Sequence, residues 1–136
     1  MKQFVTYLTF DGNCGQAMEF YKRCFGGELF VMPFSDAPGD HPKEVKDRLM
    51  HASLTTGAGT LMASDSMPGA PVKTGDNFQI MIQCDSPEET DRLFEALGQS
   101  GKVIMPLQTT FWAARFGMLT DQFGIGWMFN YEKPRG

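Results

Sequence analysis

The 136-residue sequence has few histidines and cysteines, two side chains that often serve as metal ligands or nucleophiles. It contains two histidines, His41 and His51, and three cysteines, Cys14, Cys24 and Cys84. The cysteine count is odd, and no two cysteines have the close spacing of a zinc or redox motif. We therefore expect free thiols, buried or half-buried, in a reducing cytoplasm.

Clustered positive charge and long apolar runs are also missing. The formal net charge is -4 and no run of Lys or Arg exceeds two neighbours, which argues against a nucleic-acid-binding surface. No apolar run approaches the length that spans a bilayer. The strand pattern begins within a few residues of Met1, so we expect no signal peptide. A cytoplasmic protein that binds neither nucleic acid nor membrane fits these features.

What the chain does contain is a recurring order of strand and helix signals. Residues 4–10 alternate apolar and polar side chains and are rich in β-branched and aromatic types, which indicates a strand. Residues 15–25 repeat apolar side chains at three- and four-residue spacing, which is typical of an amphipathic helix. A pair of glycines ends that helix, and residues 28–34 read as the next strand. The same order recurs in residues 78–106, where Asp85-Ser86-Pro87 predicts a helix cap followed by proline.

A shift of 73 residues, the distance from Phe20 to Leu93, aligns the two halves. The same shift places Met32-Pro33 on Met105-Pro106. Each half continues with two further strand-like runs, at 48–56 and 60–65 in the first half and at 114–121 and 125–132 in the second. The sequence therefore predicts the order βαβββ twice.

These patterns predict one α+β structural domain with a first module at 1–66, a linker at 67–77 and a second module at 78–136. Residues 35–47 form a polar, Pro- and Gly-rich insertion, which we expect to be a mobile surface loop. A βαβββ unit leaves one sheet face bare opposite its helix, so two units can cover each other by facing their sheets inward. The expected result is a curved, barrel-like cleft, which is the default place for a ligand.

Three segments of the chain resemble a known superfamily: "YLTFDGNCGQAMEFYKRCFGG", "MHASLTTGAGTLMASD" and "FWAARFGMLTDQFGIGWMFN". They resemble the vicinal oxygen chelate proteins, which include glyoxalase I, bleomycin resistance proteins and extradiol dioxygenases. More narrowly, the chain is similar to the PhnB-like branch, also known as the 3-demethylubiquinone 3-methyltransferase-like domain. The resemblance implies a glyoxalase/bleomycin resistance-like fold and a homodimer in which modules abut or are exchanged.

The resemblance also implies positions for a divalent metal. Superfamily enzymes hold the ion with His, Gln or Glu side chains from the first and last strands of each half. The matching positions here are Thr6, Met62, Gln79 and Met128, of which Gln79 alone has suitable ligand chemistry. We therefore expect no cofactor and no metal of the superfamily type, with Gln79 as the candidate ligand if a divalent metal does bind.

Several other side chains are candidates for binding a small molecule. His51 lies in a strand and could act as an acid, a base or a ligand, or be a hydrogen-bonded structural residue. Trp112 offers a flat surface and Arg115 a planar fork for an anion, unless Arg115 pairs with Asp121 or Glu132. Asn130 shares a strand face with Met128 and could line the cleft. Asp65, at the end of a strand, could receive a ligand cation or form a turn. In the second half, the pattern suggests that Asp121 occupies the corner equivalent to that of Asp65.

The function that these observations favour is binding of a small organic molecule, anionic or aromatic, without a superfamily-type metal. One alternative is a metal-dependent enzyme of the glyoxalase or dioxygenase kind, and another is a resistance protein that sequesters its ligand. A methyltransferase acting on quinone precursors is a further alternative, although no glycine-rich turn follows a strand to hold a nucleotide cofactor.

Overall fold

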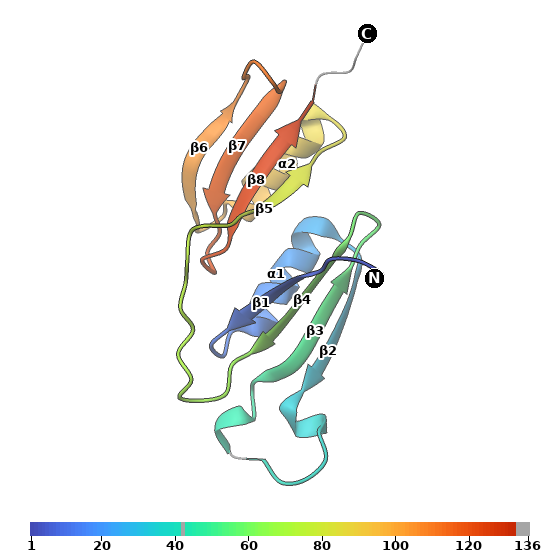
Figure 1. The fold of residues 1–136 in the computed structure, drawn as a ribbon, viewed down its shortest axis with the longest axis vertical. Helices are drawn as coiled ribbons and strands as arrows, with labels where there is room; N and C mark the ends of the chain where they lie inside the picture. Colours follow the sequence, from blue (N-terminus) through green and yellow to red (C-terminus); the bar gives the residue numbers. More distant parts are fainter. Residues whose placement is uncertain (42, 133–136) are drawn as a thin grey trace. The chain divides into compact units, whose positions relative to one another are not determined.

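In the computed structural model, which describes residues 1–41 and 43–132, the chain forms two compact units, 1–73 and 74–136 (Figure 1). Each unit contains one helix and one four-stranded sheet, in the chain order strand, helix, three strands. The predicted α+β class and the repeated βαβββ order are therefore confirmed. The cleft expected between the modules stays a prediction.

The first unit consists of β1 (Thr6–Phe10), α1 (Cys14–Phe25), β2 (Glu28–Pro33), β3 (Leu49–Thr55) and β4 (Thr60–Asp65). The strand order in its sheet is β1-β4-β3-β2. β1 runs parallel to β4, and the two other pairs are antiparallel. The last strand of the unit therefore lies in the interior of the sheet, between the first strand and the third.

Helix α1 covers one face of this sheet (Figure 1). Its buried side chains recur at helical spacing and include Ala17, Met18, Phe20, Tyr21 and Cys24. They pack on the side of the sheet that carries the buried Ala52 and Leu54 of β3. The turn after the helix requires glycine, because Gly27 has φ +90° and a Cβ there would lie 2.4 Å from the carbonyl oxygen of Thr55.

The second unit consists of β5 (Ile80–Gln83), α2 (Pro87–Leu97), β6 (Lys102–Gln108), β7 (Arg115–Thr120) and β8 (Gly126–Tyr131). Its strand order, β5-β8-β7-β6, repeats that of the first unit. β5 is parallel to β8 and the other pairs are antiparallel. The internal repeat seen in the sequence is thus a repeat of topology as well.

Helix α2 begins as its sequence predicts. The hydroxyl of Ser86 accepts a hydrogen bond from the backbone N–H of Glu89 at 3.0 Å, and Pro87 occupies the first turn. The carboxylate of Glu89 in turn accepts the backbone N–H of Asp85 at 2.9 Å. The first bond satisfies an N–H group that a helix start leaves without an intrahelical partner, and the second ties the residue before the cap to the first turn.

The insertion between β2 and β3 has more structure than a mobile loop. It contains two short 3-10 turns, Phe34–Asp36 and Lys43–Val45. Val45 is buried, so its apolar side chain is part of the core of the unit. At the end of the insertion, Arg48 donates to the Asp11 carboxylate and to the Ser66 carbonyl, both at 2.8 Å. Contacts of Arg48 thus connect the end of the insertion to the β1–α1 turn and to the end of β4, while the mobility of the insertion stays a prediction.

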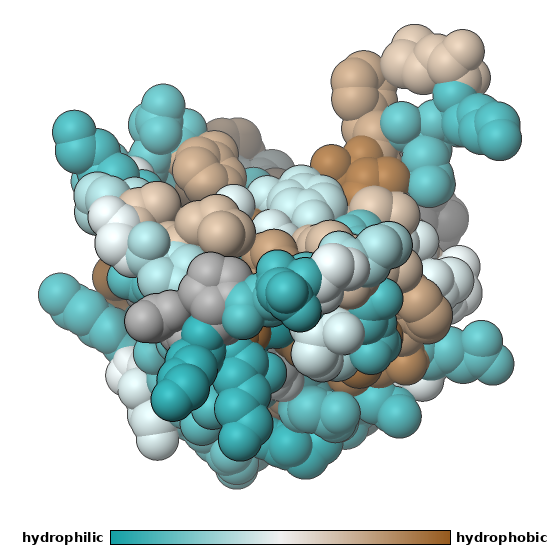
Figure 2. All heavy atoms as spheres, turned by 90° about the horizontal axis from the view of Figure 1, so that it is seen from below, coloured by the Kyte–Doolittle hydropathy of each residue, from teal (hydrophilic) through white to brown (hydrophobic). Residues whose placement is uncertain are grey.

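Hydrophilic and apolar side chains alternate on the face seen from below the first view (Figure 2). Large apolar side chains that are exposed include Phe30 and Val31 on β2, and Val103 and Ile104 on β6. Neither of the two helices in the described part of the chain has the length and apolarity that a membrane span requires.

Candidate functional site

Each sheet has one face covered by its helix and an opposite face that we call the open face. In the first unit, Ala52, Leu54 and Ala63 are buried on the helix side. Side chains alternate along a strand, so His51 of β3 and Met62 of β4 lie on the open face. In the second unit, the buried Trp127 and Phe129 of β8 face the helix side, and the residues that alternate with them lie on the open face.

His51 is hydrogen-bonded on the open face of the first sheet. The hydroxyl of Tyr7 in β1 lies 3.1 Å from Nδ1 of His51, and their ring centroids are 5.8 Å apart. Met62 is the strand neighbour of Tyr7, and Met32 is the strand neighbour of His51. Sequence reasoning missed Tyr7, although its alternation with the buried Leu8 and Phe10 already places it on the face away from the helix.

Asp65 is buried at the end of β4, on the helix side of the sheet. Its Oδ1 accepts the backbone N–H groups of Gly12 at 2.8 Å and Cys14 at 3.0 Å, and its Oδ2 accepts that of Leu49 at 2.9 Å. The carboxylate thus joins the β1–α1 turn, the start of α1 and the start of β3. The structure gives Asp65 this structural role and does not place it beside His51 on the open face.

The strand pairing corrects one of the metal positions. Thr6 pairs with Leu61, whereas Met62 pairs with Tyr7. Because neighbouring residues of a strand point to opposite faces, Thr6 and Met62 cannot face the same ion. The first-strand position on the open face is Tyr7, one residue further along.

The donors that the open faces supply do not fit a divalent metal of the superfamily type. In the second unit, Met128 pairs with Met81, and Gln79 precedes β5, exposed, with Nε2 donating to the Asp76 carbonyl at 3.3 Å. Among the residues the structure describes, no three His, Cys, Asp or Glu side chains are grouped as metal ligands would be. At the four positions that the resemblance implies, two thioethers, a hydroxyl and a single amide make a poor ligand set for a hard or borderline cation, and the nearby His51 imidazole is hydrogen-bonded to Tyr7.

Four residues of the second unit are linked by contacts or strand pairing, and we call them the amide–aromatic row: Trp112, Phe116, Asn130 and Gln83. The ring centroids of Trp112 and Phe116 are 5.5 Å apart in an edge-to-face arrangement. Phe116 is the strand neighbour of Asn130. The amide Nδ2 of Asn130 donates to Oε1 of Gln83 at 2.7 Å. The row crosses β7, β8 and β5, and its Trp112 side is exposed while Asn130 is buried.

Arg115 does not belong to this row. It alternates with Phe116 on β7 and its guanidinium forms an ion pair with Asp91 of α2, so it faces the helix side. Its Nε is buried without a hydrogen-bond partner among the described residues. The prediction that Arg115 pairs with Asp121 or Glu132 is therefore wrong. The position of Arg115 gives no support to the anion-binding role expected for it.

Asp121 closes the β7–β8 hairpin. Its Oδ1 accepts the backbone N–H groups of Phe123 at 2.8 Å and Ile125 at 3.1 Å, and its Oδ2 accepts the indole N–H of Trp127 at 2.8 Å. Asp65, by contrast, lies at the end of the last strand of its unit. The suggestion that the two aspartates occupy equivalent corners was therefore wrong, although the structural interpretation of Asp121 is supported.

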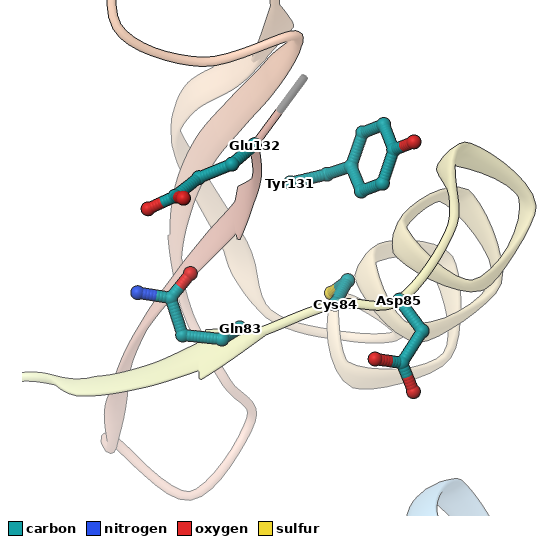
Figure 3. A pocket seen from close by; sticks show the side chains of 5 residues that line it. All are labelled: Gln83, Cys84, Asp85, Tyr131 and Glu132. Carbon is teal, nitrogen blue, oxygen red and sulfur yellow. The ribbon is translucent and has the colours of Figure 1, made fainter. Parts of the chain in front are cut away.

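A hollow of about 440 Å³ lies at the carboxyl ends of the parallel strands β5 and β8 (Figure 3). Its lining residues are Gln83, Cys84, Asp85, Tyr131 and Glu132. Tyr131 and Glu132 point to opposite sides of β8 (Figure 3). Gln83 is the member of the amide–aromatic row that reaches this hollow, and the charged side chains in the lining are carboxylates.

Cys14, which lies beside Asp65, and Cys84, which lines the hollow, are poor nucleophiles. Burial raises the pKa of the Cys14 thiol to about 12, and the neighbouring Asp65 carboxylate raises it as well. Burial is also the main cause that raises the pKa of Cys84. Because the thiolate is the reactive form, both side chains remain inert thiols near neutral pH.

Comparison with known proteins places the chain in one family. Residues 2–129 match the family model described as 3-demethylubiquinone-9 3-methyltransferase. Protein YjdN from Escherichia coli strain K12 is 33% identical over an alignment of 143 positions, gaps included, which covers 95% of each chain.

Solved structures are similar to this chain as well. Protein PA1353 from Pseudomonas aeruginosa is 47% identical, with a TM-score of 0.89 over 98% of this chain and 100% of that one. The PhnB protein from Bacillus cereus is 25% identical, with a TM-score of 0.77 over 96% and 99% of the two chains. A glyoxylase/bleomycin resistance protein/dioxygenase domain from Frankia sp. shares the fold, with a TM-score of 0.70 at 13% identity over 100% and 95%.

Proposed function

Because the chain belongs to the family described as 3-demethylubiquinone-9 3-methyltransferase, on the fold of the vicinal oxygen chelate proteins, we propose that it binds a small, planar organic molecule in the cytoplasm. The binding needs no metal of the superfamily type. The observation that carries this proposal is the amide–aromatic row on the second unit. It joins the exposed Trp112 and the buried Phe116 to two carboxamides on the second unit.

The chemistry of the row suits a flat ligand. Trp112 is 53% exposed and Phe111, which packs edge-to-face against it at 4.8 Å, is 98% exposed. Exposed aromatic rings supply a large apolar contact at a small cost in side-chain entropy. The carboxamides of Asn130 and Gln83 then supply the few polar groups that orient a ligand in a mostly apolar site.

Methionine methyl groups provide a direct test. Met118 and Met128 are strand neighbours on the open face of the second sheet, whereas Met18 is fully buried in α1. In protein labelled with 13C at the methionine methyls, we expect 2-naphthol and 2-methoxynaphthalene to shift Met118 and Met128 and to leave Met18 unchanged. Ring currents of a bound aromatic act over short distances, so the pattern locates the ligand.

Trp112→Ala is the matched variant for this titration. Removing the exposed ring should weaken binding of both probes by about tenfold, equivalent to about 1.4 kcal/mol. Phe4→Ala is the control: it removes another exposed aromatic side chain, which lies in the first unit, and should leave the affinities for both probes unchanged. If neither probe shifts Met118 or Met128 at saturating concentration, the proposed site is wrong.

The alternative functions give different results in two simple measurements. A glyoxalase- or dioxygenase-type enzyme, purified without an affinity tag and supplied with zinc, manganese or iron, would retain close to one metal per chain. That metal would be lost on changing Gln79 or His51 to Ala. A methyltransferase would bind S-adenosylmethionine in equilibrium dialysis. We expect neither result, since the donor set of the open faces is poor in metal ligands and the sequence lacks a glycine-rich nucleotide turn.

We also propose that the protein is a homodimer, as the family resemblance implies. Closed twofold pairs are the commonest assembly of soluble proteins. Light scattering on the eluting protein should then give twice the chain mass of 15.2 kDa. A mass equal to that of one chain at micromolar concentration would contradict this expectation.

A further inference from the structure

The side chain of Asn130 is buried and only half satisfied. It is 5% exposed, and its Nδ2 donates to Gln83. Its Oδ1 is buried and accepts no hydrogen bond within the described part of the chain. A carboxamide has a donor end and an acceptor end, and Gln83 serves one of them alone. Buried polar atoms of native proteins are nearly always paired, so an orphan acceptor calls for an explanation.

The surroundings of Asn130 do not supply the missing donor. Its strand neighbour on one side is Phe116, whose ring carries no hydrogen-bonding group, and on the other side it is Gln83, whose Oε1 is already the acceptor of their shared bond. The Nε2 of Gln83 turns to the thioether of Met81 at 3.4 Å, a weak acceptor. The Oδ1 therefore keeps an acceptor position that none of these neighbours fills.

We propose that Asn130 Oδ1 is the acceptor for an N–H or O–H group on the rim of a planar ligand. This inference rests on the proposed function and narrows its ligand to phenols and N–H heterocycles. The ring of a ligand whose donor reaches this oxygen would lie beside Phe116, the strand neighbour of Asn130, and Trp112, which packs on Phe116. The donor satisfies a buried acceptor that otherwise has no partner, so the bond adds affinity without breaking an existing one.

The charge around the row favours a neutral or cationic ligand over an anion. Gln83 opens onto the hollow whose charged lining residues are Asp85 and Glu132. Arg115, the nearest cation along β7, is paired with Asp91 on the opposite side of the sheet. An anionic ring would meet carboxylates without a compensating cation among these residues, which is unfavourable at short range. The proposed ligand is therefore a hydrogen-bond donor, and not the anion that the sequence position of Arg115 suggests.

A matched pair of probes tests this inference. 2-Naphthol and 2-methoxynaphthalene differ in whether the oxygen carries a hydrogen or a methyl group, so they share a ring and differ in donor capacity. We expect the wild-type protein to bind 2-naphthol about tenfold more tightly, the effect of one hydrogen bond to a buried acceptor. Asn130→Leu should bind the two probes about equally, with the affinity for the ether changed by less than about twofold.

A second measurement needs no variant and so stays informative if Asn130→Leu does not fold. In 15N-labelled wild-type protein, 2-naphthol should shift the side-chain amide signal of Asn130 more than the ether does, while the side-chain amide of Gln16, on the other unit, stays fixed. Equal affinity of the wild type for both probes, or an unmoved Asn130 amide, overturns the inference and leaves the proposed function standing. Failure of both probes to bind overturns the proposed function and this inference together.

Discussion

At the scale of single residues, the buried carboxylates of this chain act as fixed acceptors for N–H groups. Asp65 accepts three backbone N–H groups from separate segments. Asp121 accepts two backbone N–H groups and an indole N–H. Hydrogen bonds to an ionised acceptor are stronger than neutral ones, so each carboxylate is a strong local constraint.

Asp65→Asn should therefore destabilise the protein. The new amide keeps one acceptor oxygen but turns an N–H₂ group toward an N–H group of Gly12, Cys14 or Leu49, and one buried donor loses its acceptor. We expect the free energy of unfolding in urea to fall by about 2 kcal/mol.

Asp40→Asn is the matched control for this variant. The Asp40 side chain is exposed in the insertion after β2, so the same chemical change should shift the free energy of unfolding by less than about 0.5 kcal/mol. Equal urea midpoints for the wild type and Asp65→Asn would contradict the structural role given to Asp65.

The Cys14 thiol makes stability depend on alkaline pH. Its pKa rises from an ordinary 9.0 to about 12 in the folded chain. Above about pH 9 the thiol ionises in the unfolded chain while it stays protonated in the folded one, so the unfolded state gains and stability falls as pH rises toward 12. Between pH 8 and pH 10 we expect a loss of about 1 kcal/mol from this group.

Urea unfolding of the wild type and of Cys14→Ala at both pH values isolates that loss. The variant should be less stable at pH 8, because it leaves a small cavity, but it should lose less stability on going to pH 10. The pKa of Cys84 is also raised, so part of the alkaline loss persists in the variant. Parallel changes in the two proteins would show that Cys14 does not carry the effect.

At the scale of elements, periodicity predicts most of the fold because burial of one face imposes it. The apolar spacing of α1 and the cap at Ser86 both lead to the observed helices. The face of a short strand is harder to predict, because a shift of one residue exchanges its two faces. For this reason, spacing alone assigns the first-strand position on the open face to Thr6 in place of Tyr7. The correct assignment depends on the pairing of Tyr7 with Met62, which lies 55 residues later in the chain.

The partners within the site are less predictable than the elements. Arg115 pairs with Asp91, which belongs to a helix 24 residues earlier. No local pattern signals such a contact, because it depends on how α2 lies on the sheet. The orphan oxygen of Asn130 is likewise a property of packing, since the sequence shows the amide but not which of its atoms is satisfied.

Packing of α2 on its sheet depends on a glycine in β7. A Cβ at Gly117 would lie 2.8 Å from a methyl carbon of Leu107 and 2.9 Å from the ring of Phe94. Gly117→Ala should therefore force these side chains apart and lower the free energy of unfolding by about 1–3 kcal/mol.

Gly59→Ala is the comparison for this variant. Gly59 lies in the β3–β4 turn, and a Cβ there would extend into open space, with no atom of the described residues beyond its chain neighbours within 4 Å. Its replacement should therefore change stability by less than about 0.5 kcal/mol. Thermal unfolding of both variants measures the difference. Equal melting temperatures would mean that α2 can move away from β7 at little cost.

At the scale of the whole molecule, residues 66–79 connect the two units without helix or strand. Lys73 is exposed in this segment, and exposed connections of this kind are preferred sites of proteolytic cleavage. Limited trypsin digestion should therefore release fragments 1–73 and 74–136 among the first products, as identified by mass spectrometry.

Lys73→Gln should remove that pair of fragments while leaving other early cuts unchanged. Lys43 and Lys46 flank the buried Val45 in the other long connection, so cleavage there should be slower. If trypsin cut inside a strand of either sheet before it cut at Lys73, the division of the chain into two compact units would be contradicted.

The interior position of β4 and β8 has a consequence for how the protein is made on the ribosome. β1 and β3 cannot be joined into one sheet until residues 60–65 have emerged, since β4 lies between them. The backbone N–H of Cys14, at the start of α1, also has no acceptor until Asp65, the last residue of that strand, has emerged. Once residue 65 is free, however, every strand of the first sheet exists, so the N-terminal half can fold before the synthesis of the C-terminal half is complete.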